Sequence, residues 1–126
     1  MHVAKYNKSA TGHMCAHYER RKDDRGEYIK FGNQNIDLSR THLNYNLAPE
    51  HDQIEFIRQR TSEVKCQKRA DVNVMCDWVV TAPEGLDRGH LKEFFKASYD
   101  FFEKRYGQKN VISAYVHMDE TTPHMH

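Results

Sequence analysis

The residues best suited to chemistry lie in the last ten positions, His117-Met-Asp-Glu-Thr-Thr-Pro-His-Met-His126, which hold three histidines and two carboxylates. His124 and His126 are two positions apart, so in an extended segment both imidazoles leave the same face. His117 follows an apolar, β-branched run over 111–116. A tight turn from Asp119 to Pro123 would bring it beside the other two, so we expect three imidazoles to converge.

Three imidazoles form a ligand set for one divalent transition metal and leave coordination positions open, as catalytic sites require. Because neutral imidazoles do not cancel the charge of the ion, it can still bind and polarise an anionic oxygen such as that of a phosphate. Two plainer interpretations are solvated histidines at a polar terminus and a partial affinity tag. The interleaved Asp-Glu-Thr-Thr-Pro segment and the preceding strand pattern argue against both.

Length and composition indicate one domain of 126 residues with an ordinary hydrophobic content of 38%. No apolar run approaches the roughly 20 residues that cross a bilayer, and no signal-peptide pattern precedes residue 20. The three cysteines form no paired motif, which favours a reducing, cytoplasmic location over a disulfide framework. The net charge of +1 neither requires nor excludes a nucleic-acid partner.

The elements that must position the histidines follow from periodicity. Strand patterns cover 2–6, 41–47, 74–81, 111–116 and the segment from 123 to 126. Helix patterns occupy the segment after Ser9, which we expect to be its cap, the segment from 49 to about 68, and the segment from 87 to 107. Residues 26–40 are predicted to form a loop with a short hairpin over 28–31.

Four of these elements predict which side chains share a face. Alternation over 41–47 places Leu43, Tyr45 and Leu47 on one face and the polar side chains on the other, either for hydrogen bonding or simply in solvent. In the second helix, Ile54, Ile57 and Val64 form the expected core side, and the strand over 74–81 has Val74, Cys76, Trp78 and Val80 on one side. The last helix has Leu91, Phe94, Phe95, Ser98 and Phe102 on one stripe, whose aromatic side chains we expect in the core.

The order of elements is compatible with a doubly wound parallel sheet. However, no glycine-rich phosphate loop stands at a strand-helix junction, and the last two strands must form an antiparallel hairpin to gather the histidines. We therefore predict an α+β fold with a mostly antiparallel sheet and helices packed on one face. A strand that ends at His126 is short for a sheet member, so we expect either that the natural protein continues beyond it or that this is a truncated gene product.

Three segments together resemble the MobV family of plasmid mobilisation relaxases, also called plasmid recombination enzymes. The histidine-rich terminus is similar to the metal motif of that family, 39–45 (Ser-Arg-Thr-His-Leu-Asn-Tyr) resembles its second motif, and 17–20 (His-Tyr-Glu-Arg) resembles its first. The second motif departs at one position, where Asn46 stands in place of a glutamate.

The resemblance implies a relaxase fold of the HUH type and a metal-dependent endonuclease. Such an enzyme nicks single-stranded or extruded DNA at a plasmid origin of transfer and stays attached to the 5′ phosphate through a histidine. It further implies one divalent metal, Mn²⁺ or Mg²⁺ with Zn²⁺, Ni²⁺ or Co²⁺ as alternatives, and neither a small-molecule cofactor nor a membrane partner. The implied roles are His17 as nucleophile with Glu120 and Arg20 as catalytic partners, His117, His124 and His126 as metal ligands, and Asn44, Tyr45 and Arg69 as DNA contacts.

From the residues alone, a lone histidine such as His17 is more often structural than catalytic, and the basic end of the second helix is more often a solvated face than a phosphate contact. Two other functions also stay open. One is a metal-dependent phosphodiesterase that activates water and forms no covalent adduct; the other is a DNA-binding remnant that holds a metal without cutting.

Overall fold

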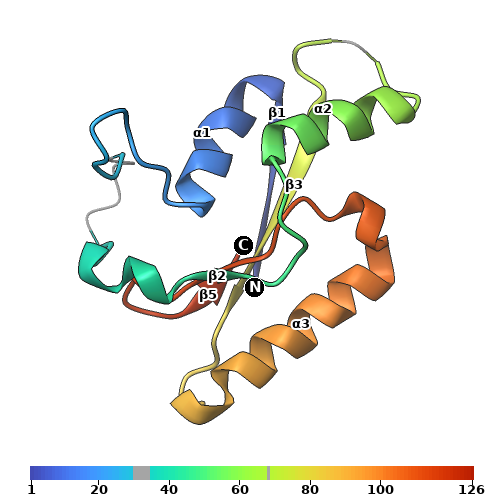
Figure 1. The fold of residues 1–126 in the computed structure, drawn as a ribbon. Coiled ribbons are helices and arrows are strands. Elements are labelled where there is room, and N and C mark those ends of the chain that lie inside the picture. Colours follow the sequence, from blue (N-terminus) through green and yellow to red (C-terminus); the bar gives the residue numbers. More distant parts are fainter. Residues whose placement is uncertain (30–34, 68) are drawn as a thin grey trace.

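The computed structural model describes residues 1–29, 35–67 and 69–126. Three helices and five strands are arranged as shown in Figure 1. The bounds are β1 His2–Asn7, α1 Lys8–Tyr18, β2 Tyr45–Asn46, α2 Gln53–Glu63, β3 Asn73–Thr81, α3 Leu91–Tyr106, β4 Tyr115–His117 and β5 His124–Met125, with short 3-10 helices at Leu38–Leu43, Arg88–His90 and Gln108–Asn110. No helix in these ranges is both long and apolar enough to cross a membrane.

The five strands form one sheet in the order β1-β3-β5-β4-β2, and every pairing is antiparallel. This confirms the α+β prediction. The two-residue strand β5 lies at the centre, between the long strand β3 and the short strand β4. The centre of the sheet is therefore formed by the segment that carries His124, and the preceding hairpin brings His117 directly opposite His124.

Helices cover both faces of the sheet, so the prediction of helices on one face was wrong (Figure 1). Val80, Val116 and Met125 face α3 and pack with its Leu91 and Phe95. On the opposite face, the cluster of Cys15, Tyr18, Ile57 and Met75 joins α1 and α2 to β3. Successive strand residues point to opposite faces, so β3 serves both cores and its sequence does not reveal a solvent side.

The predicted strand over 41–47 is a 3-10 helix, Leu38–Leu43, followed by the two-residue strand β2. The cause is local, because the Asp37 side chain accepts a hydrogen bond from the backbone N–H of Ser39 and starts the turn. Leu43 is consequently exposed, against prediction, whereas Tyr45 and Leu47 pack partly against the core.

The bounds of three other predicted elements also differ from those in the structure. The first helix begins at Lys8 after Asn7, so Ser9 is not its cap. The second helix begins after Asp52, whose carboxylate caps Glu55, and it ends at Glu63; Ile57 is buried, but Ile54 and Val64 are exposed. The strand predicted over 111–116 is assigned only from Tyr115, and the predicted hairpin over 28–31 lies partly outside the described residues.

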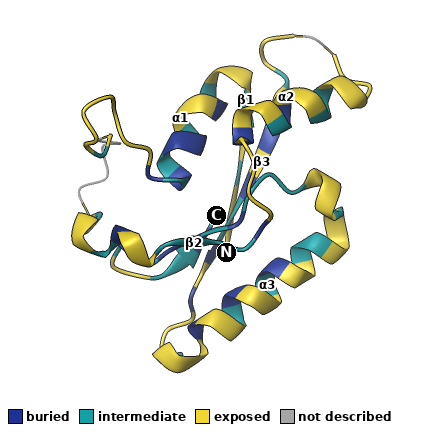
Figure 2. Ribbon diagram, in the orientation of Figure 1, coloured by how far each residue is buried: buried dark blue, intermediate teal, exposed yellow. Residues whose placement is uncertain are grey.

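The aromatic helix follows its prediction closely. It runs from Leu91 to Tyr106, and its buried residues face the sheet while the opposite side is exposed (Figure 2). Gly107 ends it with a φ of +86°, a backbone conformation that costs glycine little, and its N–H donates to the carbonyl of Glu103. Phe102 and Tyr106 reach Trp78 of β3, with ring centroids 5.4 and 6.4 Å away.

Candidate metal and phosphate site

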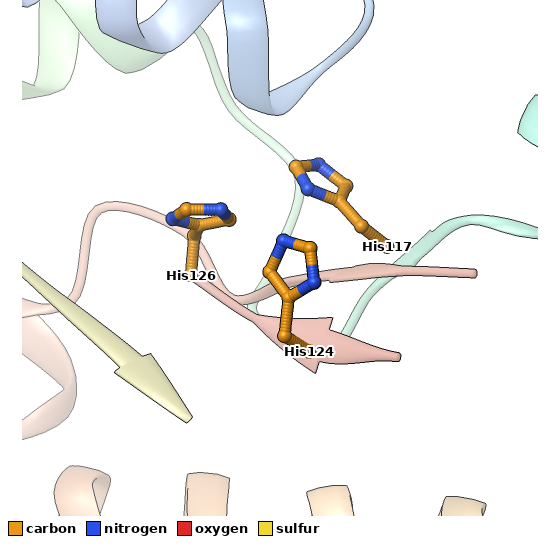
Figure 3. Close-up of side chains that lie close together, drawn as sticks. All are labelled: His117, His124 and His126. Carbon is orange, nitrogen blue, oxygen red and sulfur yellow. The ribbon is translucent and has the colours of Figure 1, made fainter. Parts of the chain in front are cut away.

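Three histidines meet on the sheet face that α1 covers. The β4–β5 hairpin places His117 opposite His124, and His126 follows one residue after β5. Figure 3 shows the three rings turned toward one another. Their centroids are 4.9 to 5.4 Å apart, and one ring nitrogen from each lies within 4.8 Å of the others. The predicted convergence of His117, His124 and His126 is therefore present in the structure.

Each imidazole is held by an oxygen on its outer side. Nε2 of His117 lies 2.7 Å from the carbonyl oxygen of Tyr18, Nδ1 of His124 lies 2.9 Å from that of Thr122, and Nδ1 of His126 lies 2.9 Å from Oδ2 of Asp77. These oxygens can only accept hydrogen bonds, so the nitrogen facing each of them carries the hydrogen. For His117 and His126 the other ring nitrogen therefore presents a lone pair, the arrangement that metal-ligating histidines need.

The inward nitrogen of His117 supports the same conclusion. Its Nδ1 is buried without a hydrogen-bond partner, an uncommon state for a polar atom. Burial, followed by the nearby charge of Arg20, lowers the pKa of His117 to about 3, so at neutral pH the ring is in its ligating form. The three imidazoles, with neutral His117 among them, therefore form a donor set that fits one divalent metal.

Glu120 lies next to the inward nitrogens. Its Oε2 is 3.2 Å from Nε2 of His124 and 3.7 Å from Nδ1 of His117. Burial lowers the pKa of His124, but hydrogen bonds to Glu120 and to the carbonyl of Thr122 outweigh that effect and raise the pKa above its usual value. The acidic residue implied by the family motif is therefore in contact with the proposed ligands.

His17 lies at the end of α1, beside the cluster. Its ring centroid is 6.0 Å from that of His117 and 6.1 Å from that of His126. Burial and then the charge of Arg20 lower the pKa of His17 to about 4, while Glu120 acts in the opposite direction. At neutral pH the ring is uncharged, which is the form that can attack an electrophile.

Arg20 connects this histidine to the metal-ligand turn. Its guanidinium, 4% exposed, forms ion pairs with Asp119 and Glu120 at 3.0 and 2.9 Å. It also donates to the backbone carbonyl of His17 at 2.8 Å. The backbone of Arg20 has a φ of +51°, which a non-glycine residue adopts only when its surroundings compensate. Arg20 is therefore held by bonds to three other residues, and its role as a catalytic partner stays a prediction.

Asp119 is the central acceptor of a buried network that sequence reasoning missed. Its carboxylate, fully buried, accepts hydrogen bonds from Arg20, from Oγ1 of Thr41 and from Nδ2 of Asn44. Asn44 also receives the backbone N–H of Met118 at 2.7 Å. Asn44, predicted to contact DNA, thus holds the segment before β2 against the turn between β4 and β5. The position of Asn44 in the second motif was the available sign of its importance, but the sequence does not show which groups Asn44 binds.

Asp77 is the second functional residue that sequence reasoning missed. Its Oδ2 accepts hydrogen bonds from the hydroxyl of Tyr18 at 2.8 Å and from Nδ1 of His126. Burial raises the pKa of Asp77, but the bonds from His126 and Tyr18 outweigh that effect and lower it. Burial and the charge of Asp77 raise the pKa of Tyr18 well above its usual value, so this hydroxyl stays protonated. The sequence offered one sign of a role for Asp77, namely a carboxylate in the middle of an otherwise apolar strand.

The remaining predicted DNA contacts lie apart from the histidines. Arg69 is exposed in the segment between α2 and β3, where it pairs with Asp71. Tyr45 is half-buried in β2, and burial raises the pKa of its hydroxyl. The structure brings neither side chain to the histidine cluster, and their DNA contacts stay predictions.

The sequence matches a family model described as plasmid recombination enzyme over residues 1–126. The chain belongs to the plasmid recombination enzyme family. Relatives of that name include one from Streptococcus agalactiae, 32% identical over 98% of this chain, and one from Bacillus thuringiensis, 42% identical over 75% of it. These matches cover 26% and 23% of the relatives' own lengths, so the chain corresponds to a minor part of them.

The fold is also that of solved members of this family. Crystal structures of the MobM relaxase domain, described as MOBV and Mob_Pre, match with a TM-score of 0.79 at 29 to 30% identity. The match covers 99% of this chain and 66% of the MobM chain. Those MobM domains are bound to plasmid oriT DNA and to manganese. The predictions of a MobV-like chain and of a relaxase fold are thereby confirmed.

Proposed function

We propose that this chain is the catalytic part of a plasmid mobilisation relaxase that cuts one DNA strand at an origin of transfer and keeps the 5′ phosphate on His17. The observation that carries the proposal is the position of a neutral His17 beside three imidazoles, one nitrogen of each lying within 4.8 Å of the others. The similar MobM relaxase domains, which are bound to manganese and plasmid oriT DNA, support the proposed function.

His117, His124 and His126 would hold one divalent ion, Mn²⁺ or Mg²⁺. Bound there, the ion supplies positive charge to a non-bridging oxygen of the scissile phosphate. The protein contributes the fixed geometry: Asp77 orients His126, the carbonyl of Tyr18 orients His117, and that of Thr122 orients His124. These bonds are made before substrate arrives, so little reorganisation is needed during the reaction.

In the covalent step, one nitrogen of His17 forms a bond to phosphorus as the bond from phosphorus to the 3′ oxygen breaks. The 3′ oxygen takes a proton from water, and the proton on the other nitrogen of the ring passes to water. The product is a phosphoramidate, which keeps the energy of the phosphodiester for later rejoining. Arg20 fixes the end of α1 through the His17 carbonyl, and Glu120 lies near enough to stabilise positive charge on the ring.

We propose that the substrate strand is single-stranded or extruded at this site, because a base-paired backbone cannot bring its phosphate into a partly buried pocket. We propose Arg69, exposed on its loop, as a contact to the DNA backbone, together with Asn44 and Tyr45 of the second motif. The proposed reaction requires no small-molecule cofactor, and we assign it to the cytoplasm, where plasmid DNA resides.

The test is trapping of the adduct. The protein is incubated with Mn²⁺ and a single-stranded oligonucleotide of the plasmid pMV158 oriT sequence that MobM binds, and the products are separated under denaturing conditions. A protein-DNA species that forms with the parent chain and with Tyr18→Phe, but not with His17→Ala, supports the proposal. Cleavage without a linked species would instead indicate an activated-water phosphodiesterase. Metal-dependent binding without cleavage would indicate a DNA-binding protein.

A further inference from the structure

A short hairpin follows α1 and carries two side chains that the proposed reaction does not use. Its two arms meet at a β-bridge between Lys22 and Tyr28, and the N–H of Asp23 donates to the carbonyl of Glu27 at 2.7 Å. The turn forms locally, because the Asp23 carboxylate accepts two backbone N–H groups of the turn and Gly26 takes a φ of +77°. Bridged residues share a face, so the Lys22 ammonium lies beside the Tyr28 ring, 4.9 Å from its centre.

Both side chains line a cavity of about 340 Å³, here named the tyrosine pocket. The other residues that line it include Glu19, Arg20, Asn44 and Tyr115. The pocket therefore lies between the end of α1, the hairpin and the strands β2 and β4. Lys22 is exposed and Tyr28 is half-buried, so solvent reaches the pocket from the hairpin side. Its volume is in the range of cavities that bind small organic ring systems.

The tyrosine pocket is one side chain away from the proposed nucleophile. Arg20 lines the pocket, and Nη1 of Arg20 lies 3.4 Å from the ring nitrogens of His17. The Arg20 side chain is buried and paired with Asp119 and Glu120, so a buried network sets the distance from the pocket to His17. A nucleotide whose phosphate lies against His17 therefore has a neighbouring base within reach of the pocket.

The walls of the pocket match the chemistry of an unpaired base. The Tyr28 ring offers a flat face for stacking, and the Lys22 ammonium beside it can pair with the phosphate of a stacked nucleotide. Burial raises the pKa of Tyr115 to about 12, so its hydroxyl stays protonated and can donate to a base edge. Glu19, whose Oε1 pairs with Arg21, can accept through its other oxygen. Donor and acceptor groups are therefore both present.

We propose that the tyrosine pocket receives one unpaired base of the substrate strand, next to the scissile phosphate, and that stacking on Tyr28 holds this base. The proposal rests on the proposed function, because it takes single-stranded DNA as the substrate and His17 as the nucleophile. A base fixed in the pocket limits the movement of the phosphate beside it and so aligns that phosphate with His17. Because a base inside a duplex is already stacked on both sides, the pocket also favours an unpaired strand.

The affinity for single-stranded oligonucleotides tests the pocket through a double-mutant cycle. The oligonucleotide has the pMV158 oriT sequence that MobM binds, and each member of a variant set carries one abasic site at a successive position. The protein forms are the parent chain, Tyr28→Ala and Tyr28→Phe. Phe101→Ala is the matched control, since it removes an exposed aromatic ring of α3. Fluorescence anisotropy gives each Kd at one salt concentration and without added metal, so that the strand is bound and not cut.

We expect an abasic site at one position to weaken binding to the parent chain about tenfold, as the loss of one stacked base should. Tyr28→Ala should weaken binding of the intact strand by a similar factor, and the same abasic site should then cause no further loss. Tyr28→Phe and Phe101→Ala should both behave like the parent chain. Tyr28→Leu, which has bulk without a flat face, replaces the alanine variant if that variant melts at a lower temperature.

Two results would overturn the base pocket. One is a parent chain in which no abasic position weakens binding. The other is a Tyr28→Ala variant that loses the same factor for every oligonucleotide, abasic ones included, because Tyr28 would then not act through a base. If no oligonucleotide binds, the proposed function fails and the pocket fails with it. The expected affinities without a covalent adduct in the trapping experiment would support the pocket and overturn only the role of His17.

Discussion

Arg20 and Asp119, 99 residues apart in the sequence, form a two-point ion pair, with Nε and Nη2 of the arginine each 3.0 Å from a different carboxylate oxygen. Both side chains are buried, at 4% and 0% exposure. The pair joins the end of α1, which carries His17, to the turn that carries the metal ligands. It therefore sets the distance between the proposed nucleophile and the proposed metal.

Replacing Asp119 with asparagine should destabilise the protein on the order of 3 kcal/mol, because it leaves the buried Arg20 charge with Glu120 as its remaining partner. Urea unfolding measures this change. Glu55→Gln is the matched control, since it breaks an exposed pair with Arg58 and should leave the free energy of unfolding nearly unchanged. Similar losses in the two variants would show that the buried pair is not a major source of stability.

Asp77→Asn should weaken Mn²⁺ binding by about 10- to 100-fold, because it removes the charged acceptor that orients His126. His124→Ala, which removes a ligand, should abolish binding altogether. Tyr18→Phe is the control, since it deletes the other hydrogen bond to the Asp77 carboxylate and leaves the one from His126. Calorimetry measures all three variants. Parent-like affinity in His124→Ala would disprove the ligand assignment.

The bond between protein and DNA should be acid-labile and base-stable, because protonation of a phosphoramidate nitrogen makes it a good leaving group. A tyrosyl phosphodiester would survive mild acid. The trapped adduct is therefore split between mild acid and mild base before electrophoresis. Tyr45→Phe should behave like the parent chain. An adduct that persists in acid, or that forms in His17→Ala but not in Tyr45→Phe, would eliminate His17 as the nucleophile.

The metal-free protein should lose stability as the pH falls below about 6.5. His17 and His117 have folded-state pKa values of about 4 and about 3, below the ordinary 6.5, so the unfolded chain takes up protons first. Their contribution is complete above pH 6.5 and is lost progressively toward the folded-state values. The pKa values of Asp77 and Asp119 are also lowered, which adds a further loss below about pH 3.8.

Thermal melting at pH values through this window tests the sign. His17→Asn should flatten the decline between about pH 6.5 and 4, because a non-titrating residue then occupies the buried position. His90→Asn changes an exposed histidine and should leave the decline as it is in the parent chain. A melting temperature that stays level or rises as the pH drops from 6.5 to 4 would contradict the neutral, buried state of these two rings.

Much of this protein can be predicted from short-range spacing in its sequence. The i, i+2 spacing of His124 and His126 puts both rings on one strand face whatever the rest of the chain does, and a turn brings His117 opposite them. The aromatic stripe and Gly107 likewise specify α3 and its end. These features depend only on residues that are close in the chain, so their geometry follows from the backbone period.

Only the tertiary structure decided the partners of Arg20, Asp119 and Asp77. Asp119 accepts from Thr41 and Asn44, 78 and 75 residues away, and Asp77 reaches His126 across 49 residues. Such pairs depend on strand register and on the packing of helices against both faces, which no local pattern specifies. The missed 3-10 helix before β2 has a different cause, because it begins at a local hydrogen bond from the backbone N–H of Ser39 to the Asp37 side chain.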